Sequence, residues 1–174
     1  MIISHKMAER DDIYSSKSKY VGVFSFSKFY EFCYNWVMSE IEPDEFDEKS
    51  YSEKNVGDAK NIDIVWKFSK KLTDYFTFEG SASFKTIMMK KVELNRNGKT
   101  VKANQGEISI TVKGILVKDS KNKFESSSFA RKLKIIYEKW IIASRIDQFE
   151  EKVFTDSDEF LEQTKAFLEL EGRK

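Results

Sequence analysis

Residues 61–118 read NIDIVWKFSKKLTDYFTFEGSASFKTIMMKKVELNRNGKTVKANQGEISITVKGILVK, and this stretch contains the clearest structural pattern of the chain. Its apolar residues alternate with polar ones at a period of two, as they do in strands whose side chains point to opposite faces of a sheet. We therefore predict three long antiparallel strands with one apolar and one mostly polar face. The apolar face collects Ile62, Ile64, Trp66, Phe68, Phe76, Phe78, Ala82, Phe84, Ile108, Ile110, Val112 and Leu116.

Two polar turns connect these strands. Residues 71–74 join the first strand to the second, and an odd-numbered loop there places Trp66 beside Gly80 or Ala82. The large indole would then lie over a residue with little or no side chain. Residues 97–98 are Asn-Gly, a dipeptide that readily adopts the positive φ angles of a type I′ hairpin turn.

The second hairpin sets the register of the sheet. A tight turn pairs Leu94 with Val101, but the apolar residues of the third strand then change phase. We therefore predict a one-residue bulge within residues 104–106, a stretch that ends in glycine. A bulge at this position places Phe84 opposite Val112.

The first third of the chain gives weaker signals. Residues 1–18 are predicted to form a loose N-terminal segment, residues 19–24 a short edge strand and residues 41–60 an acidic connector. Ser25 or Ser27 can cap a helix that runs to about residue 40. The face of that helix predicted to pack on the sheet contains Phe29, Phe32, Cys33, Trp36 and Val37.

Residues 119–174 are predicted to form two helices. The first is capped within residues 126–128 and is broken within residues 155–159, where the second begins with an inward stripe that includes Phe160 and Phe167. A helix with apolar stripes on two sides is expected to pack against the sheet and against another helix or subunit. One stripe contains Phe129, Leu133, Ile136, Trp140 and Ala143, and the other contains Ile135, Ile142, Ile146, Phe149 and Val153.

These elements predict an α+β fold in a single domain, residues 1–174. Its antiparallel sheet has three long meander strands and a candidate fourth edge strand near the N-terminus. A long C-terminal helix pair and an N-terminal helix are expected to pack on one face of the sheet.

Composition narrows the functional classes. The net charge is +1, which gives no global attraction to nucleic acid, although residues 61–118 hold 11 Lys and Arg against 5 Asp and Glu. Cys33 is the single cysteine, so no internal disulfide can form. Apolar runs are too short to span a bilayer, which predicts a cytoplasmic protein without a membrane span.

Catalytic and metal-binding patterns are scarce. His5 is the only histidine and lies in the predicted loose N-terminal segment, so no Ser-His-Asp or Cys-His catalytic arrangement is expected. One histidine with one cysteine also makes a poor zinc site. No phosphate-binding glycine loop occurs. Asp63 and Glu79 on the polar face are expected to pair with lysines. We therefore predict a protein that is not an enzyme and has no cofactor or metal.

The polar face of the sheet offers two binding hypotheses. Four apolar residues on it would form a protein interface if they cluster, namely Val65, Ile87, Met89 and Ile115. Alternatively, Lys67, Lys85 and Lys113 could contact phosphates together with the serines between them. Single-strand binders also stack bases on exposed aromatic residues, which this face lacks except for Tyr75, so nucleic acid ranks below the other partners.

The order of short strand, helix, antiparallel meander and long C-terminal helix resembles the helix-grip fold of START-type lipid-binding proteins. In that family the last helix closes a cavity over a curved sheet. The resemblance rests on element order, and it departs from the family in strand number, since about seven strands are usual there. It implies a ligand cavity lined by Trp66, Phe68, Phe78, Phe84 and Trp140.

Three functional hypotheses follow in order of preference. The first is a protein-interaction or structural module that self-associates through its C-terminal helices. The second is a carrier of an apolar small molecule or lipid between the sheet and the last helix. The third is a weak nucleic-acid binder that uses the basic face of the sheet.

Overall fold

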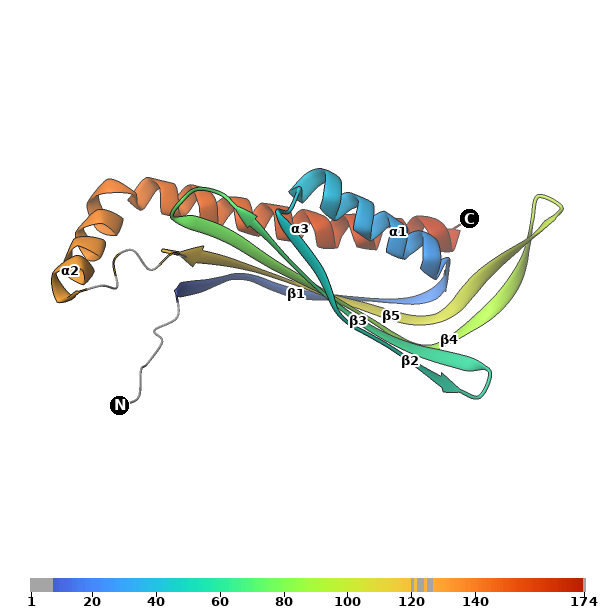
Figure 1. Ribbon diagram of the computed structural model, residues 1–174. Coiled ribbons are helices and arrows are strands. Elements are labelled where there is room, and N and C mark those ends of the chain that lie inside the picture. The colour runs from blue at the N-terminus through green and yellow to red at the C-terminus, as the bar shows by residue number, and fades with distance from the viewer. Residues whose placement is uncertain (1–7, 120, 122–123, 125–126, 174) are drawn as a thin grey trace, which may run out of the picture.

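The computed structural model describes residues 8–119, 121, 124 and 127–173 of the chain. It confirms the α+β fold, with one antiparallel sheet of five strands in the order β1-β5-β4-β3-β2 (Figure 1). The strands are β1 Glu9–Phe24, β2 Glu45–Val56, β3 Ala59–Lys71, β4 Phe76–Arg96 and β5 Lys99–Lys118. The helices are α1 Phe26–Trp36, α2 Ser128–Ile136 and α3 Ala143–Arg173, and the π-helical turns are η1 Val37–Ile41 and η2 Tyr137–Ile141.

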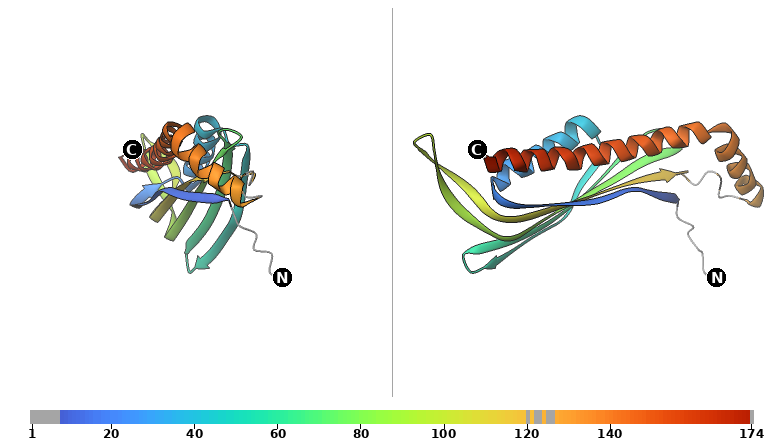
Figure 2. Two further views of the ribbon diagram at one scale, coloured as in Figure 1. Left: turned by 90° about the vertical axis from the view of Figure 1, so that its left-hand side faces the viewer. Right: turned by 180° about the vertical axis from the view of Figure 1, so that it is seen from behind.

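Helices α1 and α3 lie side by side on one face of the sheet, and within the described residues the opposite face carries no helix (Figures 1 and 2). The covered face is the one that the alternation predicts. Trp66 is fully buried there, opposite Ala82 as expected, with its ring edge-on to Phe84. Its Nε1 donates a hydrogen bond to Glu48 at 3.1 Å, which satisfies the indole N–H that burial would otherwise leave unpaired.

The predicted bulge lies on the wrong strand. Asn97 and Gly98 have positive φ angles and Leu94 pairs with Val101, as predicted. The register then shifts at Met88 and Met89 of β4, opposite Gly106, rather than within β5. The additional residue on β4 shifts the register by one, whereas the predicted bulge on β5 would have shifted it by one in the opposite direction. The observed partners therefore differ from the predicted ones by two positions, so that Phe84 pairs with Ile110 and not with Val112.

Two segments that were predicted to be irregular are edge strands. β1 begins at Glu9 and pairs with β5, so residues 9–18 are not loose, whereas residues 1–7, which include His5, lie outside the described residues. β2 pairs with β3 through a turn at Gly57, so the acidic connector is wrong for residues 45–56. Because β2 lies at the sheet edge and its side chains are nearly all exposed, its sequence carries no apolar alternation.

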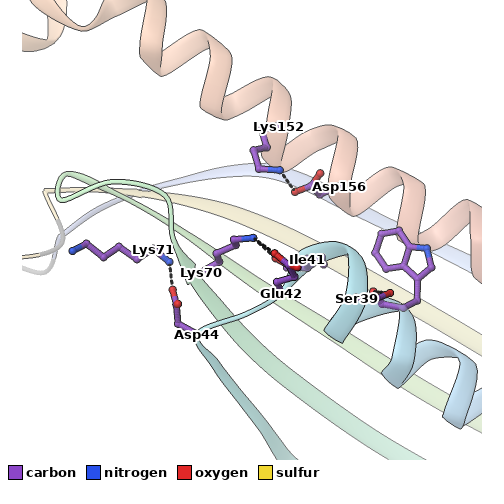
Figure 3. A network of polar contacts seen from close by, with 9 residues as sticks. Ser39, Ile41, Glu42, Asp44, Lys70, Lys71, Lys152 and Asp156 are labelled. Atoms are coloured by element: carbon purple, nitrogen blue, oxygen red, sulfur yellow. Dashed lines mark hydrogen bonds and ion pairs between the residues drawn. The ribbon is translucent and has the colours of Figure 1, made fainter.

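The corner between η1 and β2 is held by contacts with β3 (Figure 3). Lys70 Nζ donates a hydrogen bond to the carbonyl oxygen of Ile41 at 2.6 Å, and Glu42 adopts a left-handed conformation with φ of 51°. The backbone N–H of Lys71 donates to the Asp44 carboxylate at 2.6 Å. These contacts between distant parts of the chain turn the backbone into β2.

The helix break predicted within residues 155–159 is also wrong, because α3 runs without interruption through this stretch. Its acidic residues are instead used in contacts: Asp156 pairs with Lys152 at 2.9 Å (Figure 3), and Asp158 accepts a hydrogen bond from Tyr14 of β1 at 2.9 Å. The actual break is Ile142, whose φ and ψ of −118° and 9° are not helical.

Candidate interaction surface

The break at Ile142 separates α3 from α2 and η2, residues 128–141, which together form a segment that we call the arm. The arm turns away from the axis of α3 at one end of the molecule (Figures 1 and 2). Ser127 caps its first turn by accepting a hydrogen bond from the Ala130 N–H at 3.1 Å. Its last turn closes with the Ile142 N–H donating to the Tyr137 carbonyl at 3.0 Å, a π-helical bond.

The largest apolar side chains of the arm face solvent. Phe129, Leu133, Ile136 and Trp140 are spaced by four, three and four residues, which places them on one side of a helix. Their exposed fractions are 71%, 42%, 52% and 75%, respectively. We call these four residues the outward stripe. Ile135 and Ile141 are also exposed, outside this stripe.

The side of the arm that faces the protein is polar. Lys134 is only 9% exposed, and its Nζ lies 3.2 Å from Glu9 Oε2 at the start of β1. Lys118 of β5 contacts the same carboxylate at 3.1 Å and Asp11 at 2.9 Å. Burial raises the pKa of Glu9, but hydrogen bonds and charge from Lys118 and Lys134 outweigh it, so the pKa lies below its ordinary value.

Aromatic contacts extend this inward side. Tyr75 donates a hydrogen bond to Glu138, and burial together with that bond raises the pKa of Tyr75 far above its ordinary value. Tyr137 stacks on Phe124 with ring centroids 5.7 Å apart. A hollow of about 540 Å³ between the arm and the β3–β4 turn is lined in part by Tyr75, Tyr137 and Ile141. The arm therefore touches the body through polar and aromatic groups rather than through its apolar stripe.

Charges on the exposed part of the arm are all positive. Arg131, Lys132 and Lys139 are exposed, and within the described residues no ion pair involves them. Lys139 Nζ lies 5.5 Å from the Trp140 ring centre, in cation–π geometry. The one acidic residue of the arm, Glu138, is only partly exposed and bonded to Tyr75. The surface that the arm offers is thus apolar and basic.

The residues predicted as an interface on the polar sheet face do not form one patch. Val65 and Ile87 line a shallow hollow of about 650 Å³ on the open face. Ile115 pairs with Glu79, whereas Val65 pairs with Ser83. The placement of Met89 on this face is wrong: Met89 is 5% exposed and belongs to the core cluster, because the bulge rotates it to the helix side.

The residues predicted to line a cavity fill the space between sheet and helices instead. Trp66, Phe68, Phe78 and Phe84 are each at most 5% exposed and in ring contacts, such as the edge-on contact of Phe68 with Phe78 at 5.9 Å. Trp140 does not line this space, because it lies on the outward stripe. The element order expected from the helix-grip resemblance is present, but the aromatic residues expected around a ligand pack on one another.

The basic residues of the open face are only partly aligned. Lys67 and Lys113 both pair with Ser81, so they lie on one line across the sheet. Lys85 lies elsewhere, opposite Ser109, and its Nζ is 3.6 Å from Asp63. Glu79, the other acid of this face, accepts hydrogen bonds from Arg10. Both acids therefore pair with cations.

Comparison with models of known protein families and with curated proteins finds no match for the chain. Within the described residues, no group of three His, Cys, Asp or Glu side chains is placed to hold a metal ion. No helix of that same part is long and apolar enough to cross a membrane. Cys33 is buried, which raises the pKa of its thiol. The arm is the feature that most needs a functional explanation.

Sequence reasoning identified the outward stripe but expected it to be covered. Helical spacing shows which residues share a side, and it cannot show toward which side the body of the protein lies. One signal was available: Lys132 and Lys139 flank the stripe, and the segment holds a single acid. A basic border around an apolar stripe is typical of helices that dock on another surface.

Proposed function

We propose that the protein is a non-enzymatic interaction module that docks through the outward stripe of the arm. One observation supports this most: the arm is amphipathic in the reverse sense, with Lys134 and Glu138 turned to the body and Trp140 turned to water. A surface helix of a folded protein normally buries its apolar stripe and exposes its charges.

The outward stripe leaves much of its apolar surface unburied in the folded chain. Fully burying a Leu, Ile or Phe side chain is worth about 1.5–3 kcal/mol, and the folded chain gains little of this from Phe129, Ile136 or Trp140. Contiguous exposed apolar side chains bordered by polar ones mark interaction sites on folded proteins. The free energy left unused in the isolated chain is available for docking.

Two isoleucines, Ile136 on the outward stripe and Ile142 in the core, test whether docking and folding use different residues. The same substitution is made at both positions. Ile136→Ser, on the stripe, should change the free energy of unfolding by less than about 0.5 kcal/mol, as surface substitutions usually do. Ile142→Ser, at a site that is 6% exposed, should lower it by about 2–4 kcal/mol. Urea titration followed by circular dichroism measures both. Equal losses would mean that the stripe is part of the core, and the proposal would fail.

A second copy of the chain is the partner first expected from the sequence, and the spacing of the stripe supports it, because intervals of four and three residues also form the seams of paired helices. Sedimentation velocity from low to high micromolar concentration tests this pairing. If a second copy is the partner, the mass rises with concentration for the native chain and stays monomeric for Ile136→Ser. The carrier hypothesis has less support, since aromatic residues fill the expected cavity.

A further inference from the structure

The exposed arm combines two chemical features in one short helix. Apolar residues of three shapes, Phe129, Ile136 and Trp140, occupy its outward side, and cations border them. At about 100° per residue the outward stripe spans an arc of about 60°, and Lys132 and Lys139 lie about 70–90° to one side of its centre. Long lysine side chains at this angle can reach the polar layer above an apolar phase in which the stripe is buried.

The sign of the exposed charge restricts the partner. Residues 128–141 hold Arg131, Lys132, Lys134 and Lys139 against Glu138, a net charge of +3. Of these five, Lys134 and Glu138 face the body, and Arg131 lies about 170° from the centre of the stripe at 100° per residue, so Lys132 and Lys139 are the charges that border the stripe. Two copies meeting stripe to stripe would bring four cations together without a counter-charge. A negatively charged surface with an apolar layer beneath it matches the arm better.

From these observations we propose that the partner of the arm is the surface of a lipid bilayer that contains anionic lipids. This inference rests on the proposed function, because it names the partner of the same stripe. The outward stripe would be buried at the boundary between head groups and acyl chains, with Trp140 at the level that tryptophan favours. Lys132 and Lys139 would contact anionic head groups.

The position of the arm permits this orientation. The arm lies at one end of the elongated molecule, away from α1 (Figures 1 and 2). Arg145, in the first turn of α3, is exposed beyond the break and adds a cation near the same end. An arm of 14 residues is about 21 Å long, which suits a helix lying in the plane of the surface rather than crossing it.

Vesicle binding tests the proposal with the full chain. Co-sedimentation is measured with phosphatidylcholine vesicles and with vesicles that also contain about one-third phosphatidylserine, at low and at raised salt. We expect binding to the anionic vesicles that weakens with salt, and at least about tenfold weaker binding to neutral ones. Binding should shift Trp140 emission to shorter wavelength, and Trp140→Phe identifies that component against Trp36 and Trp66.

Variants separate the contributions of stripe and cations. Ile136→Ser with Trp140→Ser should weaken vesicle binding at least about tenfold, and Lys132→Gln with Lys139→Gln should abolish most of the preference for anionic vesicles. Leu170→Ser and Lys28→Gln are matched controls, since both residues are exposed on other elements, and they should leave binding unchanged. Circular dichroism confirms that each variant is folded.

The outcomes distinguish the partner from the arm itself. If the native chain ignores anionic vesicles but sediments as a stripe-dependent dimer, the lipid proposal is overturned while the docking role of the arm survives. If vesicles bind but the stripe variants bind equally well, the arm is not the docking element and both proposals fail. If the native chain neither binds vesicles nor associates, both are likewise overturned.

Discussion

Lys134 of α2 and Glu9 of β1 form an ion pair at 3.2 Å, although 125 positions separate them in the chain (134 − 9). Glu9 shares its carboxylate with Lys118 at the end of β5, so the pair ties the arm to two neighbouring strands. This contact helps to set which side of the arm faces the body. With Lys134 turned inward, the outward stripe remains largely exposed in the part of the chain that the structure describes.

Acid should loosen this attachment. The pKa of Glu9 lies below its ordinary value of 4.5, so its contribution to stability is fully present above that value and is lost as the pH falls through the lower folded pKa. Because 45% of the side chain is exposed, we expect an effect below about 1 kcal/mol. The hydrogen-exchange protection factors of the α2 amides, which are corrected for the intrinsic pH dependence of exchange, should fall in acid for the native chain. Glu9→Gln should already exchange faster at neutral pH, and unchanged exchange in that variant would contradict the role of the pair.

Ser157→Ala should stabilise the protein. Ser157 is 2% exposed, and its Oγ has no hydrogen-bond partner in the described part of the structure. Removing an unsatisfied buried hydroxyl and gaining helix propensity should raise the free energy of unfolding by about 1 kcal/mol. Urea denaturation measures the change, with Ser144→Ala on the exposed side of α3 as the propensity control. A loss of stability would show that this hydroxyl is in fact satisfied.

Gly80→Ala should destabilise the sheet. A methyl group at Gly80 would lie 2.0 Å from Cε2 of Phe68, a buried ring on the neighbouring strand. Such overpacking costs about 1–3 kcal/mol. In a double-mutant cycle, Phe68→Leu should reduce the cost of Gly80→Ala, because the shorter side chain leaves room for the methyl group. Additive effects of the two substitutions would argue against this contact.

Alkaline pH should weaken the joint between β1 and α3. Burial and the hydrogen bond to Asp158 raise the pKa of Tyr14 from 10.0 to about 12. The neutral phenol is therefore favoured in the folded state, so its contribution is complete below pH 10 and is lost as the pH rises through about 12. A two-unit shift corresponds to about 3 kcal/mol. Tyr14→Phe should show a shallower loss of stability over this range, and a slope identical to that of the native chain would exclude the contact as its cause.

The three central strands were predictable because each of them shows apolar alternation within its own sequence. Period-two alternation around Trp66 and Phe84 assigns a face to every residue, and Asn97-Gly98 closes the hairpin with local backbone chemistry alone. The bulge was located one strand away from its true position, since a phase change between paired strands does not reveal which of them holds the additional residue. The strand pairing places the additional residue on β4. Gly106 lies opposite it, where a Cβ would be 2.8 Å from the Met89 Cα, so the glycine accommodates the bulge without containing it.

Local sequence patterns were enough to predict the α+β class, the face of the sheet that is buried and the residues that share the outward stripe, because these depend on the fixed periods of strand and helix. Contacts between distant residues were needed to establish that residues 9–18 and 45–56 are strands, that α3 continues through Asp156 and that the stripe of the arm faces water. Each of these outcomes depends on partners far away in the chain, such as Glu9 for Lys134 and Tyr14 for Asp158. No local pattern encodes such partners, since an ion pair or a strand ladder exists only after the fold has brought its two sides together.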